Sequence, residues 1–239
     1  MKELMLKRGI WISAFICVLA LLLGMPYGQI EPPLAAGSFL KFYRASLQSQ
    51  IMVFFLPVAA SLPAGAVFLQ ESKSGFLKLY CVRMNRMEYL KRKLFQVYVS
   101  GAFPFFLAGL LAFLICFLVF FPLEIVGEIK GEEILEAFLL LMRICLIGGM
   151  LAELSGFFAA IFLNYYMAYG LPFVCFYFLV ILKDRYLPDM YAMYPAEWIL
   201  CEENWGESGN GIWLFLLAFT ALALILHGFL LDLRLKEIV

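Results

Sequence analysis

The sequence lacks the common signatures of enzymes. Its 239 residues include a single histidine, His227, and six scattered cysteines, with no C-x-x-C and no His/Cys pair at the spacing of metal ligands. It contains no G-x-x-x-x-G-K-[ST], no G-x-S-x-G and no H-E-x-x-H motif. We therefore expect no catalytic site and no metal site in this chain, and no hydrolysis of ATP by it.

Charged residues are also scarce. They make up only 15% of the chain and their net charge is zero, whereas 64% of the residues are hydrophobic and 17% are aromatic. A soluble core does not need that much apolar surface, so the composition indicates an integral membrane protein. A helix needs about 20 apolar residues to cross a bilayer. The sequence predicts an all-α fold, one domain over residues 1–239, with six transmembrane helices at residues 9–25, 51–69, 94–121, 137–163, 166–182 and 212–231.

The longest basic run, residues 71–93, lies between the second and third predicted spans. It holds seven Lys or Arg residues and only two acidic residues, Glu71 and Glu88. Lys and Arg next to spans are retained in the cytoplasm, so this loop predicts that both termini are cytoplasmic. The acidic loop 122–136 and the segment 183–211 then lie on the external side.

The pattern of the basic loop predicts two separate helices. Apolar residues at four-residue spacing from Phe76 to Met84 predict a short amphipathic helix over residues 75–84. Asn85, with Glu88 three residues later, fits a capping box and predicts that a new helix starts near Arg86. The short helix is either a solvated basic surface beside anionic headgroups or a docking helix for a cytoplasmic partner.

Two segments depart from the pattern of straight spans. Pro57 and Pro63 both fall in the second predicted span, which predicts a kink or a break there. The segment 183–211 is rich in Tyr, Trp and Met and contains Pro188 and Pro195. It is expected to be re-entrant or to cap the bundle, as an aromatic belt at the membrane interface or as an external gate.

The fourth predicted span carries small residues at four-residue spacing. Gly148, Ala152, Gly156 and Ala160 would let a neighbouring helix backbone approach closely, so we expect them to be helix-packing residues. Glu153 lies beside this ladder near the middle of the span. An ionised carboxylate at that depth needs a partner, a proton or a watery cavity.

Three polar residues in the spans are therefore candidate functional residues. Glu153 makes either a structural contact between helices or part of a translocation path. Arg143 lies nearer the outer end of the same span, where its side chain either extends outward toward the acidic loop or, like Glu153, makes an interhelical polar contact or lines a translocation path. His227, near the inner end of the last span, is expected to make an interhelical or interfacial contact.

The order of these parts resembles the permease subunit of bacterial ABC exporters, in the type 2 export class that is also called the type V fold. That class has six spans, a cytoplasmic loop between spans two and three, and re-entrant helices before span six. Its loop commonly reads as an acidic residue, a glycine, an apolar helix, spaced basic residues, then Tyr-Leu and a lysine that begins span three. The corresponding residues here are Glu71, Gly75, Phe76 to Tyr80, Arg83, Arg86, Tyr89, Leu90 and Lys93.

The resemblance implies a function and a set of partners. Two permease subunits, identical or related, would form the translocation pathway in the bacterial cell membrane, in contact with lipid. Two separate cytoplasmic ABC ATPase subunits would bind ATP and Mg, so this chain would bind no cofactor, and no nucleic acid would be involved. The ATPase would dock on the loop through Glu71, Gly75, Phe76, Leu79, Tyr80, Arg83 and Arg86.

Two other functions stay open from the sequence. The chain could work alone as a secondary transporter or channel that uses Glu153, or it could be a membrane scaffold that transports nothing. The sequence does not identify a transported substrate.

Overall fold

The predicted all-α architecture is confirmed over the part of the chain that the structure describes. The structure is a computed structural model that describes residues 8–29, 33–63, 65–75, 77, 85–125, 127, 130–206 and 210–238. The α-helices are α2 (Arg8–Leu23), α3 (Ser38–Leu47), α4 (Gln50–Ser61), α5 (Val67–Lys73), α7 (Arg86–Phe120), α8 (Gly131–Phe162), α9 (Tyr165–Tyr186), α10 (Glu197–Leu200) and α11 (Gly211–Ile238). Single 3-10 turns occur at η1 (Tyr27–Gln29), η2 (Phe121–Leu123) and η3 (Tyr191–Met193).

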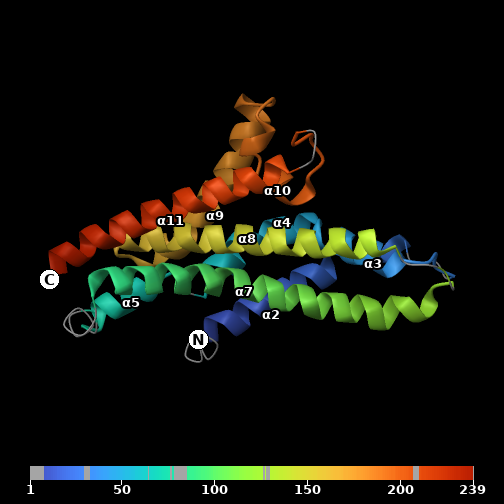
Figure 1. Cartoon of the computed structure of the whole chain (residues 1–239), viewed down its shortest axis with the longest axis horizontal. Helices are drawn as coiled ribbons and strands as arrows, with labels where there is room; N and C mark the ends of the chain where they lie inside the picture. The colour runs from blue at the N-terminus through green and yellow to red at the C-terminus, as the bar shows by residue number, and fades with distance from the viewer. Residues whose placement is uncertain are drawn as a thin grey trace.

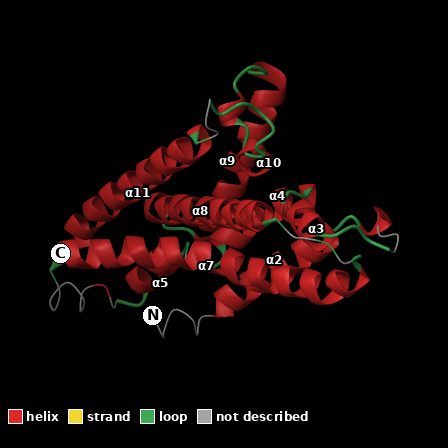
Figure 2. Cartoon of the chain, turned by 45° about the vertical axis from the view of Figure 1, so that its right-hand side comes forward, coloured by secondary structure: helices red, strands yellow, loops and turns green. Residues whose placement is uncertain are grey.

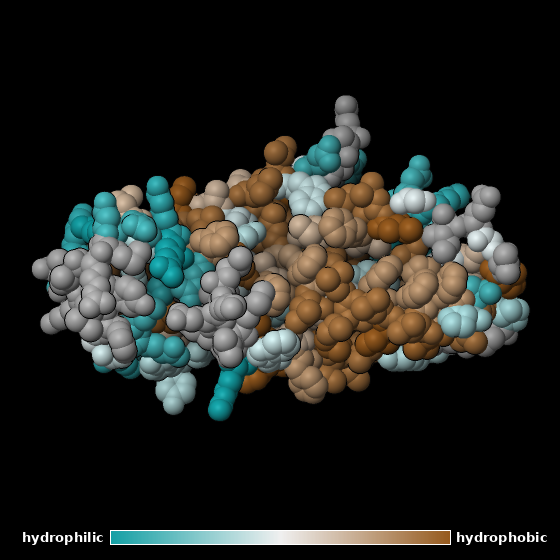
Figure 3. Space-filling view, turned by 60° about the horizontal axis from the view of Figure 1, so that its bottom comes forward, coloured by the Kyte–Doolittle hydropathy of each residue, from teal (hydrophilic) through white to brown (hydrophobic). Residues whose placement is uncertain are grey.

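Four of the described helices, α7, α8, α9 and α11, are long and apolar enough to cross a membrane. Helices α2 and α4 are also apolar, but they have only 16 and 12 residues. Many large apolar side chains on the long helices are exposed, and Figure 3 shows a hydrophobic middle region with hydrophilic residues toward both ends. The chain therefore has the features of a membrane-embedded, multi-pass protein, while the count of six spans stays a prediction.

The predicted break in the second span is present. Helix α4 ends at Ser61, after Pro57, and helix α5 begins at Val67, after Pro63. A proline removes one backbone donor and its ring crowds the preceding turn, so it ends or kinks a helix. The predicted span 51–69 is therefore two short helices joined by a turn.

Helix α8 is the central element of the bundle. In Figure 1 it lies between α7 and α11, and it also packs against α9, α4, α3, α5 and α10. Of its most apolar stretch, 61% is buried within the chain, against 28% or less for the other three long helices. Arg143, Glu153 and Ser155 of α8 are thus buried among other parts of the chain.

The two ends of the bundle carry different connections. Figure 1 places α5, the start of α7 and the C-terminus together at one end, and α3 with the α7–α8 connection at the other. The cytoplasmic placement of the basic loop and of both termini stays a prediction. Figure 2 shows the last turns of α9 standing away from the bundle, next to the loops around α10.

The segment 183–211 is a folded part of the bundle. It contains η3 and α10, and it buries Trp198, whose indole Nε1 donates a hydrogen bond to the Ala192 carbonyl at 2.8 Å. The Glu197 carboxylate accepts from the Glu203 amide at 2.8 Å and from the Trp205 indole at 3.2 Å. These contacts join parts of the segment to one another, while Trp198 packs against Phe215 and Phe219 of α11 and α10 packs against α8. A re-entrant or capping role stays a prediction.

Helix α3 is capped by a residue that is distant in the sequence. The Glu124 carboxylate accepts hydrogen bonds from the backbone amides of Gly37, at 2.9 Å, and Phe39, at 2.6 Å. Gly37 has a φ of 79°, which lies in the left-handed region, so its backbone is not helical and α3 begins after it. The carboxylate satisfies free amides at the helix start and ties α3 to the end of α7.

Replacement of the capping carboxylate should loosen this end of the bundle. We expect Glu124→Ala to lower the free energy of unfolding by about 1–2 kcal/mol, because two amides lose their acceptor. Thermal unfolding of the purified protein in detergent measures the change. Glu202→Ala, at an exposed site, is the matched control, and equal effects of the two substitutions would contradict the capping role.

Candidate functional site

Glu153 and His227 form a buried pair between α8 and α11. The Nδ1 atom of His227 lies 2.5 Å from the Oε2 atom of Glu153, and the two residues are 0% and 1% exposed. The sequence predicted that Glu153 needs a partner, a proton or a watery cavity and that His227 makes an interhelical or interfacial contact, but it did not pair them. The structure places them in direct contact across 74 residues of sequence.

The small-residue ladder of α8 shapes the surroundings of this pair. A Cβ atom at Gly156 would collide with the His227 ring, so only glycine leaves room for the imidazole. Toward α7, a Cβ atom at Gly101 would lie 2.7 Å from the Gly148 carbonyl oxygen and would collide with Ala152. The ladder therefore allows close approach of both α7 and α11.

Two polar atoms of the pair have no partner among the described residues. Glu153 Oε1 and His227 Nε2 are both buried, and neither makes a hydrogen bond. An unsatisfied buried polar atom costs about 1–3 kcal/mol, so such a site is stable only with support from its surroundings. Chemically, the pair can hold a proton that moves between imidazole and carboxylate, and its two free atoms can each bind one further polar group.

A second polar cluster lies at the flanks of the basic loop. Glu71, near the end of α5, accepts hydrogen bonds from the Tyr89 hydroxyl at 2.7 Å and from Lys93 Nζ at 2.6 Å. Tyr89 and Lys93 both belong to the first turns of α7, and both are buried. The chain on either side of the loop is thus joined by a carboxylate with two donors.

A third set of contacts ties the same end to α11 and α8. Arg86 forms an ion pair with the Asp232 carboxylate and also donates to the Asp232 carbonyl at 2.8 Å. Arg234 donates to the carbonyl oxygens of Ala160 and Ile161, each at 3.0 Å. The free carbonyls at the end of α8 therefore have a guanidinium partner.

The predicted docking residues have different outcomes. The start of a helix at Arg86 is confirmed, because the Asn85 side chain accepts from the Met87 amide at the start of α7. Gly75 has a φ of 74°, a conformation that suits glycine. Phe76, Leu79, Tyr80 and Arg83 lie outside the described residues, so the amphipathic helix over residues 75–84 stays a prediction.

Arg143 makes a polar contact between helices instead of extending outward toward the acidic loop. Its side chain is only 8% exposed and donates to the Ile199 carbonyl at 2.9 Å. Ile199 belongs to the short helix α10, whose last carbonyls have no partner within the helix. The Arg143 guanidinium is the hydrogen-bond donor for the Ile199 carbonyl, and this contact holds the side chain inside the protein.

Sequence reasoning missed the partners of these residues. No sequence pattern paired Asp232, Arg234 or Tyr89 with the residues that they contact. Arg86 and Asp232 are 146 residues apart, and no local pattern links them. Within the described ranges, no group of three or more His, Cys, Asp or Glu side chains could hold a metal ion.

No protein-family model and no curated protein matches this sequence. The positions and contacts of its side chains therefore carry the functional argument.

The Glu153–His227 pair should show strong coupling in stability. We expect Glu153→Leu and His227→Leu each to lower the free energy of unfolding by about 3 kcal/mol, because each leaves one buried polar partner alone. The double variant removes both and should be more stable than either single variant. Denaturant unfolding in detergent measures all four proteins, and losses that simply add would contradict the coupling.

Proposed function

We propose that this chain is the membrane-spanning permease subunit of an ATP-driven ABC exporter. The cluster of Glu71, Tyr89 and Lys93 carries the proposal, because it joins the two flanks of the basic loop at the end of the bundle that also holds the C-terminus. A loop whose two flanks are joined can transmit a force from a docked partner to α5 and α7, the helices on either side of it. The two shorter apolar helices α2 and α4 before the loop and the four long apolar helices after it support the same function.

The energy would come from separate subunits. Two cytoplasmic ABC ATPases, with ATP and Mg, dock on the loop 71–93, and a second permease subunit, identical or related, completes the translocation pathway. The proposed location is the bacterial cell membrane. The sequence has no P-loop motif, so a partner is required for ATP-driven work.

The contacts at the inner end suggest how force is distributed. A push on the loop reaches α5 and α7 through the Glu71–Lys93 ion pair, and α11 through the Arg86–Asp232 ion pair. The hydrogen bonds of Arg234 to the Ala160 and Ile161 carbonyls transmit this force from α11 to the end of α8. Small residues keep α7, α8 and α11 in close contact, so a displacement of one of these helices is passed to its neighbours.

The docking role of the loop can be tested by charge reversal. We expect Arg83→Glu to abolish co-purification of the partner ATPase, because it replaces a donor of the docking surface with a repelling carboxylate. Arg185→Glu, at an exposed site at the end of α9, is the matched control and should leave the complex intact. Retained co-purification in a folded Arg83→Glu protein would contradict the proposal.

A second candidate function is a stand-alone secondary transporter. The observation in its favour is the buried Glu153–His227 pair, whose two unpartnered atoms suit a proton or ion site. In this case the single chain would move protons or ions without an ATPase.

Reconstitution separates the two functions. If the chain works alone, liposomes that contain only this protein should show proton flux under a pH gradient, and Glu153→Gln should reduce that flux at least tenfold. Glu132→Gln, at an exposed site at the start of α8, is the control. Flux indistinguishable from that of empty liposomes would exclude the stand-alone transporter.

A further inference from the structure

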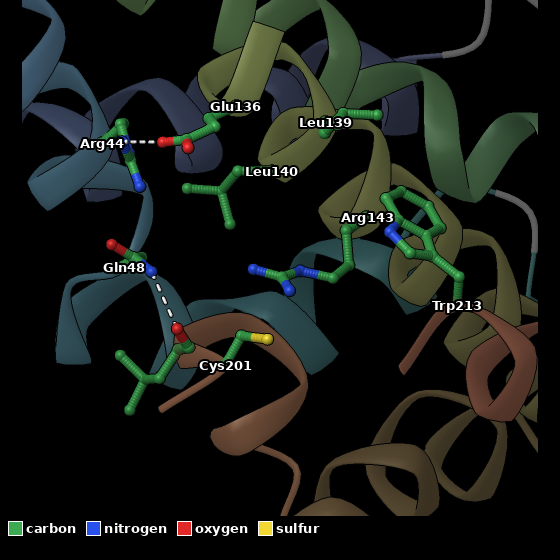
Figure 4. A pocket seen from close by; sticks show the side chains of 9 residues that line it. Arg44, Gln48, Glu136, Leu139, Leu140, Arg143, Cys201 and Trp213 are labelled. Carbon is green, nitrogen blue, oxygen red and sulfur yellow. Dashed lines mark hydrogen bonds and ion pairs between the residues drawn. The ribbon is translucent and has the colours of Figure 1, made fainter. Parts of the chain in front are cut away.

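A cavity of about 280 Å³ lies between α3, α8, α10 and α11, at the end of the bundle opposite the basic loop. Figure 4 shows its walls, with side chains from all of these elements facing a common space. The lining residues are Arg44, Gln48, Glu136, Leu139, Leu140, Arg143, Leu200, Cys201 and Trp213.

Arg143 is the central polar group of this cavity. Its guanidinium reaches into the space between Leu140 and Cys201 (Figure 4), although the residue is only 8% exposed. Among the described residues it makes one hydrogen bond, to the Ile199 carbonyl, and its buried Nε atom has no partner there. No ion pair among the described residues involves Arg143, so a nearly buried cation faces the cavity without an acidic neighbour in contact.

The other charges of the cavity cancel. Arg44 and Glu136 form an ion pair at 2.6 Å, with both side chains at least one-third exposed. Gln48 donates its amide to the Leu200 carbonyl at 3.0 Å and contributes no charge. The cavity therefore carries one uncompensated positive charge, that of Arg143.

The remaining walls are apolar. They consist of the leucine side chains and the indole of Trp213. A buried cation is costly unless it is paired, and a guanidinium binds carboxylate and phosphate oxygens through two parallel N–H groups. An anionic group attached to an apolar body would satisfy both the guanidinium and the apolar walls.

We propose that this cavity binds one oxyanion, a phosphate or carboxylate group, carried by an amphiphilic molecule such as an anionic lipid. Arg143 is the primary ligand, and Arg44 becomes a second donor when it releases Glu136. The proposal does not depend on the exporter function, because it concerns binding alone.

Binding can be measured on the full chain, purified in an uncharged detergent. The probes are inorganic phosphate and phosphatidylglycerol in mixed micelles, each titrated while the midpoint of thermal unfolding is followed. We expect at least one probe to raise the midpoint of the wild type in a saturable way, and Arg143→Gln to weaken that response at least tenfold. Arg185→Gln removes an exposed guanidinium elsewhere and should leave it unchanged.

The two probes also identify the source of the anion. A response to phosphatidylglycerol alone assigns the cavity to a lipid headgroup, whereas an equal response to inorganic phosphate assigns it to a small free anion and contradicts the amphiphilic carrier. No saturable response to either probe, or the same response in wild type and Arg143→Gln, would overturn the proposal.

A second variant keeps the test decisive if Arg143→Gln does not fold. Glu136→Gln alters only a surface ion pair and leaves Arg44 free to bind the ligand. It should tighten binding of the responding probe several-fold. Unchanged or weaker binding by this variant would count against the site.

Discussion

Polar groups inside an apolar bundle must find their partners within the chain, and this constraint governs the structure. Buried hydroxyls show its simplest form: Ser13 donates to the Ala59 carbonyl and Ser155 to the Ala168 carbonyl, each at 2.6 Å. Each of these bonds joins two different helices. Neither water nor lipid replaces such a bond at that depth, so each one also fixes how the helices pack.

Helix α8 shows how the same constraint concentrates polar contacts between helices in one element. It carries Arg143, Glu153 and the Ala160 carbonyl at successive levels, spaced by about 15 Å and about 10 Å along the helix axis. Each level has a partner on another element: α10 for the first and α11 for the other two. A movement of α11 along α8 would therefore disturb two polar contacts together, which gives the helix pair a small set of preferred positions.

Local sequence signals predicted local structure well. Asn85 placed the start of α7 at Arg86, and the two prolines of the second predicted span placed the break between α4 and α5. The small residues at four-residue spacing indicated close helix packing, which the neighbours of Gly101 and Gly156 show. These features depend on backbone chemistry within a few residues, and such chemistry is visible in the sequence.

The sequence by itself determined that the chain is helical, apolar enough for a membrane, and marked by a basic loop and by a few costly polar residues. Only the tertiary structure decided which of these residues meet: Glu153 with His227, Arg86 with Asp232, and Arg143 with α10 rather than the acidic loop. The physical reason is that hydropathy and helix signals act over one or two turns, whereas these contacts join residues separated by 56 to 146 positions. Their pairing depends on how whole helices pack, which no local pattern encodes.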